Sequence, residues 1–241
     1  MINREQDQQI TDYLIFHRLP LDILLEVKDH MAIQITDIQI SKNVDFDEAF
    51  LETKKRWADE FKMASYSVFY GEQIPVLVKN IVKAGNNSMM GKALLFGLVS
   101  FAVNFILLYL SADEAVYSMT FRIYNSLVAV SPLMMWIFYS DIRNYIKRDF
   151  KYKGKVFYSM YQQNLGIYMG SVSVIFQLIN GNFYHAFRFL RMNEPVSEFS
   201  VLIDFTFPFI LHFLIIFVLM NFFRHRKAVN GMKDFLNSSA G

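Results

Sequence analysis

The sequence contains no cysteine, which excludes disulfide bonds, thiolate metal sites and cysteine nucleophiles. It also lacks a pair of histidines spaced four residues apart and a serine in a nucleophile-elbow pattern. The histidines are instead scattered along the chain, at His17, His30, His185, His212 and His225. We therefore expect neither an enzyme nor a metal or cofactor site.

A phosphate-binding loop and a nucleic-acid-binding surface are also absent. Five residues rather than four separate Gly85 from Gly91, and Ala93 stands where a Ser or Thr would bind magnesium. The formal net charge is only +2, and the basic residues lie beside hydrophobic stretches. Nucleic acid is therefore not expected as a partner.

Long apolar stretches begin at residue 93 and indicate a membrane protein. Ala93–Leu110 carries no charge, and as a helix it is about 27 Å long, close to the thickness of a bilayer hydrocarbon core. Three more apolar stretches follow, at Ile123–Tyr139, Tyr161–Leu178 and Val201–Phe223. Because the first twenty residues lack the apolar core of a signal peptide, we expect insertion to begin internally and to give four transmembrane helices.

The charges of the loops predict the orientation. Residues 140–157 hold six basic residues, and three more follow the last span, whereas the 179–198 loop holds only Arg188 and Arg191. The positive-inside rule then predicts a multi-pass protein of the cytoplasmic (inner) membrane with both termini cytoplasmic. The segments predicted on the cytoplasmic side are 1–92, 140–157 and 224–241.

The first 62 residues have the character of a water-facing unit, with eight Lys or Arg and thirteen Asp or Glu, a net charge of −5. Apolar residues at helical spacing predict three short helices, separated at Leu19-Pro20 and at Ser41-Lys42-Asn43. The third helix is expected to open near Asp45 or Asp47 and to continue its apolar stripe through Ala64 and Val68. The stripes predict a shared core that includes Leu14, Leu24, Met31, Ile35, Phe50, Trp57 and Phe61.

These patterns predict an all-α fold, in which a small cytoplasmic three-helix head precedes a four-helix transmembrane bundle. The expected domains are the head at 1–70, an amphipathic juxtamembrane linker helix at 71–92, the transmembrane domain at 93–223 and a cytoplasmic tail at 224–241. In the linker, Pro75 suits a first helical turn, and Ile74, Val78, Ile81 and Val82 form one apolar face. Such a helix either lies on the inner leaflet or forms a fourth helix of the head.

The order of motifs in the head resembles a known module. Leu19-Pro20 is followed by Glu26 and Asp29-His30 on the second helix, and Phe46-Asp47-Glu48-Ala49 enters the third. Over roughly residues 10–62, this order resembles the helical prefix domain found ahead of FtsX-like permeases, and it is similar to the helical HAAS signalling domain of bacterial membrane proteins. The resemblance implies a bacterial protein with a cytoplasmic regulatory or assembly module, and it carries no catalytic residue across.

Six polar residues within the predicted spans are candidate site residues: Asn104, Asn125, Ser131, Gln177, Asp204 and His212. Counting 1.5 Å per residue puts Asn104 and His212 near the midplane, and Ser131 about 12 Å below the outer surface, close enough to join them. The other three collect near the outer edge, where Arg188 or Arg191 could pair with the Asp204 carboxylate. Because unpaired polar groups at such depths are costly, we expect all six to face the bundle interior. They form structural hydrogen bonds, or else His212 and Asp204 respond to protons.

Small residues and prolines in the spans predict local packing and kinks. Gly166, Gly170 and Ser173 remove side-chain bulk from one face, which favours close packing against another span or a second copy of the chain. Pro132 and Pro208 each remove one helical hydrogen bond, so both helices are expected to kink.

Two classes of function remain. The first is a non-enzymatic regulatory or accessory subunit whose cytoplasmic head binds a protein partner while the spans contact the lipid bilayer. The second is a small transporter or channel subunit, alone or as a homo-oligomer, that uses the intramembrane polar residues.

Overall fold

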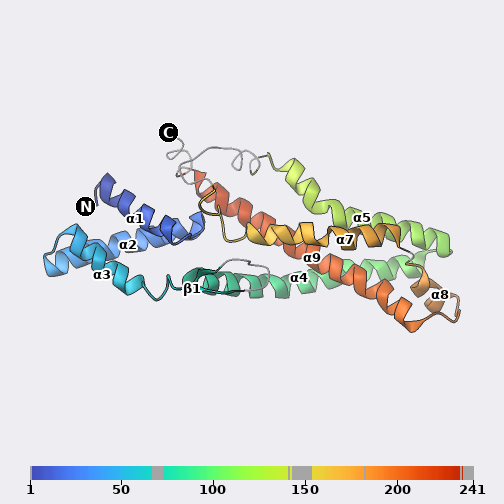
Figure 1. The fold of residues 1–241 in the computed structure, drawn as a ribbon. Helices are drawn as coiled ribbons and strands as arrows, with labels where there is room; N and C mark the ends of the chain where they lie inside the picture. Colours follow the sequence, from blue (N-terminus) through green and yellow to red (C-terminus); the bar gives the residue numbers. More distant parts are fainter. Residues whose placement is uncertain are drawn as a thin grey trace. The chain divides into compact units, whose positions relative to one another are not determined.

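The computed structural model describes residues 2–66, 73–140, 142, 154–181, 183–233 and 235, without the side chains of residues 172–174 and 178–180. The described residues are mostly helical, as predicted, and the only strands among them are the two-residue β1 (Met63–Ala64) and β2 (Ile74–Pro75) (Figure 1). The helices are α1 (Arg4–Phe16), α2 (Leu21–Lys42), α3 (Phe46–Trp57), α4 (Val76–Leu110), α5 (Glu114–Phe138), the 3₁₀ helix η1 (Gln163–Leu165), α7 (Gly166–Asn180), α8 (His185–Arg191) and α9 (Glu198–Gly231).

The chain forms two compact units. Unit 1 comprises Met1–Gly85, Asn144–Gln163 and Arg224–Gly241, and unit 2 comprises Asn86–Arg143 and Asn164–Phe223. Three separate stretches of sequence therefore build unit 1, and two build unit 2.

The three helices of the head begin and end where local side-chain chemistry directs. Asn3 and Gln6 form a reciprocal capping box at the start of α1, and the Asp45 side chain accepts the Glu48 N–H at the start of α3. Asn43 closes α2 in the left-handed conformation, which asparagine tolerates better than most residues. The predicted breaks and the predicted N-terminus of the third helix are confirmed.

One hydrophobic core runs through unit 1. α2 packs against both α1 and α3, and Figure 1 shows the three helices side by side. The predicted core residues Leu14, Leu24, Met31, Ile35, Phe50 and Phe61 are buried. Trp57 is only half-buried at the edge of this core, where its indole N–H donates to Gln34 Oε1 at 2.9 Å. The same core includes Val78 and Val82 of α4, Tyr158, and Val229 and Met232 at the C-terminal end.

The third helix is shorter than its apolar stripe predicted. It ends at Trp57, Phe61 is buried from a turn, and Ala64 lies in β1, while Val68 is outside the described residues. The chain reverses here because the Val76 and Leu77 N–H groups donate to the carbonyls of Lys62 and Glu60. The apolar residues therefore keep a helical spacing beyond Trp57, although the α-helix ends there.

The linker and the first predicted span form one continuous helix, α4. Pro75 directly precedes its first residue, and the helix then runs for 35 residues without a break at residue 92. Val78 and Val82 are only 3% exposed, and both belong to the core of unit 1. Of the two predicted placements of the linker, these contacts favour a helix packed on the head.

In the described part of the chain, three helices are long and apolar enough to cross a membrane: α4, α5 and α9. Four spans were predicted, and the third of them, Tyr161–Leu178, corresponds to α7, which has only 15 residues. The reason is local: the Tyr161 N–H donates to Ser159 Oγ at 3.2 Å, and the chain makes a turn and then η1 before α7 begins. Fifteen residues of α-helix measure about 22 Å, which is shorter than a hydrocarbon core.

The surface of unit 2 is unusually apolar for a water-soluble protein. Many large hydrophobic side chains are more than half exposed, among them Val99 on α4, Leu127 on α5, Phe176 on α7 and Leu202 on α9. Exposed apolar side chains in such number are typical of a surface that contacts a membrane or another protein. Together with the three apolar helices, it indicates a membrane protein.

Gly97 permits a close approach between α4 and α9 within unit 2. A Cβ atom at this position would lie 3.2 Å from the Cα and 3.3 Å from the N of Phe213 on α9. By contrast, a Cβ atom on Gly166 or Gly170 would meet nothing within 4 Å among the described atoms. The small residue that packs α4 against α9 is therefore Gly97, which the sequence reasoning did not single out.

Candidate functional site

A buried network of polar side chains joins α4, α5 and α9 inside unit 2. Asn125 donates through Nδ2 to Asn104 Oδ1 at 2.8 Å and to the Phe121 carbonyl at 2.8 Å. Its Oδ1 lies 2.9 Å from Nε2 of His212. All three side chains are at most 2% exposed. The structure thus brings three of the six candidate polar residues together, with Asn125 at the centre.

Two atoms of this network have no described partner. His212 Nδ1 and Asn104 Nδ2 are buried without a hydrogen bond among the described residues. A buried polar atom without a partner is costly, so such groups are commonly paired with water or with a bound group. The network thus holds one imidazole and two amides, and it is not a group of His, Cys, Asp or Glu side chains that could hold a metal ion.

A second buried network in unit 2 consists of three asparagines. Asn164 Nδ2 lies 2.9 Å from Asn86 Oδ1 and 2.9 Å from Asn221 Oδ1. The sequence reasoning missed this site. Asn164 and Asn221 lie close to the predicted cytoplasmic ends of the third and fourth spans, and counting depth from those ends would have placed them at one level.

Asp204 is buried, but neither arginine pairs with it. Its Oδ2 accepts the Ala186 N–H at 2.9 Å, and its Oδ1 lies 3.4 Å from His185 Nδ1. Arg188 instead forms a two-point pair with Glu114, at 2.6 and 3.1 Å. Arg191 donates to the Tyr109 and Leu108 carbonyls at the C-terminus of α4, where a cation is favourable. The expected arginine–Asp204 pair is therefore wrong.

The other candidate residues lie apart from the network. Ser131 is half-buried, and its hydroxyl donates to the Val128 carbonyl at 2.7 Å. This is the carbonyl that Pro132 leaves without its helical N–H donor, so Ser131 repairs the hydrogen bonding of α5. Gln177 is exposed on α7, and the side chain of Ser173 lies outside the described residues.

In unit 1, polar contacts hold the loop at residues 154–162. The Leu21 N–H donates to the Phe157 carbonyl at 2.9 Å, and the Met160 N–H lies 3.3 Å from both carboxyl oxygens of Asp22. Ser159 Oγ is 2.8 Å from Nδ1 of the buried His225. The loop is thereby tied to the start of α2 and to the end of α9.

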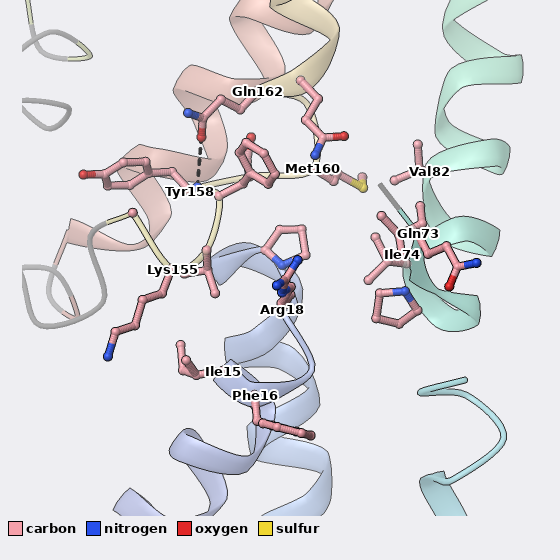
Figure 2. A pocket seen from close by; sticks show the side chains of 18 residues that line it. Ile15, Phe16, Arg18, Gln73, Ile74, Val82, Lys155, Tyr158, Met160 and Gln162 are labelled. Atoms are coloured by element: carbon pink, nitrogen blue, oxygen red, sulfur yellow. Dashed lines mark hydrogen bonds between the residues drawn. The ribbon is translucent and has the colours of Figure 1, made fainter. Parts of the chain in front are cut away.

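This loop forms one wall of a cavity of about 710 Å³ in unit 1, shown in Figure 2. The other walls come from the end of α1, including Ile15 and Arg18, and from Gln73 through the first turns of α4. Gln162, on the loop side, is held in place because its Oε1 accepts the Tyr158 N–H at 2.9 Å. A cavity of this size is within the range of small-molecule sites in proteins.

Asp22 should make the stability of unit 1 depend on pH. Burial raises the pKa of its carboxyl group from 3.8 to about 6, although hydrogen bonds from the Met160 and Ile23 N–H groups oppose the shift. Because the folded state then binds the proton more tightly than the unfolded state, stability should fall as pH rises from about 4 to 6. The loss should be on the order of 2 kcal/mol, allowing for the partial exposure of the side chain.

Thermal unfolding of the full chain between pH 4 and 7 measures this effect. Asp22→Asn should remove the loss while keeping an acceptor for the Met160 N–H. The matched control is Asp37→Asn, an exposed position on the same helix, which should keep the wild-type pH profile. A wild-type protein that gains stability over this pH range relative to Asp22→Asn would show that the fold favours the charged carboxylate.

No group of three or more His, Cys, Asp or Glu side chains that could hold a metal is present in the described part of the chain. No protein-family model, curated protein or solved structure matches this chain. Inferences about function therefore depend on the geometry of the two units.

Proposed function

We propose that this chain is a non-enzymatic integral membrane protein that acts as a regulatory or accessory subunit, with its head binding a protein partner. The observation that carries the proposal is the shared core of unit 1. Core residues of α1, α2 and α3 pack in the same cluster as Val78 and Val82 of α4 and Val229 of α9. A partner that binds the head thus contacts a unit whose core includes the ends of two apolar helices, α4 and α9. The resemblance of the head to bacterial signalling and permease-associated modules agrees with this role.

We further propose that unit 1 is cytoplasmic and that the chain crosses the inner membrane four times. The predicted cytoplasmic segments fall largely in unit 1, although five of the six basic residues of the 140–157 loop lie outside the described residues. The chain leaves unit 1 after Gly85 and after Gln163 and returns each time, which requires an even number of crossings if unit 2 is embedded. The fourth crossing is α7 together with η1, which adds about 6 Å at 2.0 Å per residue.

Cysteine labelling tests this topology, because the native chain has no cysteine. Lys55→Cys and Ser197→Cys both place a thiol at an exposed position. We expect an impermeant maleimide applied to intact cells to label the second variant and to label the first only after permeabilisation. Labelling of Lys55→Cys alone in intact cells would reverse the orientation. Labelling of both variants would mean an even number of crossings between residues 55 and 197, where the proposal has three.

Affinity purification of the tagged full chain from native membranes tests the regulatory role. Ile33 and Ile40 of α2 are 59% and 76% exposed, and seven residues apart they share one helix face, which makes them the choice for disruption. We expect one protein to co-purify in a fixed ratio, and Ile33→Ser/Ile40→Ser to lose it. Leu51→Ser, at an exposed position on α3, is the control and should retain it. Equal loss from all variants would indicate non-specific capture.

A transporter or channel subunit is the second candidate, and the unpartnered His212 Nδ1 and Asn104 Nδ2 atoms favour it. A proton or ion pathway needs buried polar groups that can exchange partners. If the chain is a transporter or channel subunit, the wild-type protein in reconstituted vesicles should give a flux of protons or ions. His212→Leu should abolish this flux without loss of assembly. The regulatory proposal expects no flux from either protein.

A further inference from the structure

The cavity in unit 1 has the composition of a ligand site rather than of a packing defect. Apolar side chains from three walls line it, among them Ile15 of α1, Val82 of α4 and Met160 of the loop. Figure 2 shows Arg18 among the side chains of these walls. The cavity is partly open to the surface, and its volume of about 710 Å³ is within the range of small-molecule sites.

The charged side chains among the described lining residues of the cavity are of one sign. Arg18 and Lys155 both line it and are both exposed, and no Asp or Glu is among its described lining residues. Asp22 holds the loop by accepting the Met160 N–H, but it is not one of the lining residues. The lining therefore favours a negatively charged group near the opening and an apolar group inside.

We propose that this cavity binds a small anionic amphiphile, a molecule with an apolar chain and a negatively charged head group. The chain contacts the walls formed by Ile15, Val82 and Met160, and the head group lies near Arg18 and Lys155. Such a molecule comes either from the bilayer or from solution.

Native mass spectrometry of the full chain in a non-ionic detergent tests the proposal with defined probes. Phosphatidylglycerol is compared with phosphatidylcholine of the same acyl chains, and dodecanoate is compared with dodecanol. We expect the anionic member of at least one pair to bind about tenfold more tightly than the neutral member. If phosphatidylglycerol shows the preference and displaces dodecanoate, the ligand comes from the bilayer. If dodecanoate shows the preference and displaces phosphatidylglycerol, the ligand comes from solution.

Variants that remove positive charges test whether the anionic probe binds in this cavity. Arg18→Gln/Lys155→Gln should weaken binding of the anionic probe about tenfold, and Lys155→Gln alone about threefold. Arg4→Gln/Lys55→Gln removes the same charge from exposed positions of unit 1 that do not line the cavity, and should change binding less than twofold. Equal binding of anionic and neutral probes, or an equal loss from the two double variants, would overturn the proposal.

Discussion

Leu24→Ala should destabilise unit 1 by about 2–5 kcal/mol. The Leu24 side chain is fully buried at the centre of the core that α2 shares with α1 and α3. Its truncation removes three carbon atoms and leaves a cavity that a packed helical core fills only in part. Since whole domains are stable by only 5–15 kcal/mol, we expect partial unfolding of the head at physiological temperature. Hydrogen exchange of the α1–α3 amides in the full chain measures the loss.

Ile40→Ala is the matched control on the same helix. Ile40 is 76% exposed, so its truncation should change the free energy of unfolding by less than about 0.5 kcal/mol. Exchange rates that rise equally in the two variants would mean that Leu24 is not in a packed core. The full chain is the appropriate sample because the core of unit 1 includes Val78, Val229 and Tyr158, which lie outside the head sequence.

Asn125→Leu should destabilise unit 2 by about 2–4 kcal/mol, the largest effect that we expect from any single change in the polar networks. Asn125 is the partner of both Asn104 and His212. Because one further atom of each of these residues already lacks a described partner, the substitution leaves two buried polar side chains without a side-chain hydrogen bond. Thermal unfolding of the full chain in detergent measures the effect.

The triple variant Asn104→Leu/Asn125→Leu/His212→Leu is the control. Removing every polar member of the network leaves no buried group unpaired, so most of the stability should return. A triple variant less stable than Asn125→Leu would show that the hydrogen bonds themselves, rather than the cost of unpaired groups, stabilise unit 2. Interhelical hydrogen bonds in membranes contribute only about 0.6 kcal/mol on average, so we do not expect that result.

The depth of Asn125 shows how far the sequence could predict this network. The second span was counted from Ile123, where the uninterrupted apolar run begins, so Asn125 was expected near the outer edge. In the structure α5 begins at Glu114, capped by Asp113, and Asn125 lies eleven residues into the helix, about 16 Å. This is the depth predicted for Asn104 and His212. By the same count Ser131 lies too deep to join them.

The amino-acid sequence by itself determined the features that depend on neighbouring residues along the chain. The length of an apolar run indicates a helix that can cross a bilayer, and the caps at Asn3, Asn43 and Asp45 end or begin helices through local hydrogen bonds. The all-α class, the three head helices, most of the head core and three of the four predicted spans follow from such local patterns.

Only the tertiary structure decided which side chains meet. The partners of Asp204, the pairing of Arg188 with Glu114, the close approach at Gly97 and the cavity beside Arg18 all depend on how each helix is rotated and where it begins. A shift of one residue turns a side chain by about 100° around the helix axis and moves it 1.5 Å along that axis. Hydropathy does not specify a helix start to one residue, so contacts between elements distant in sequence could not be predicted from it.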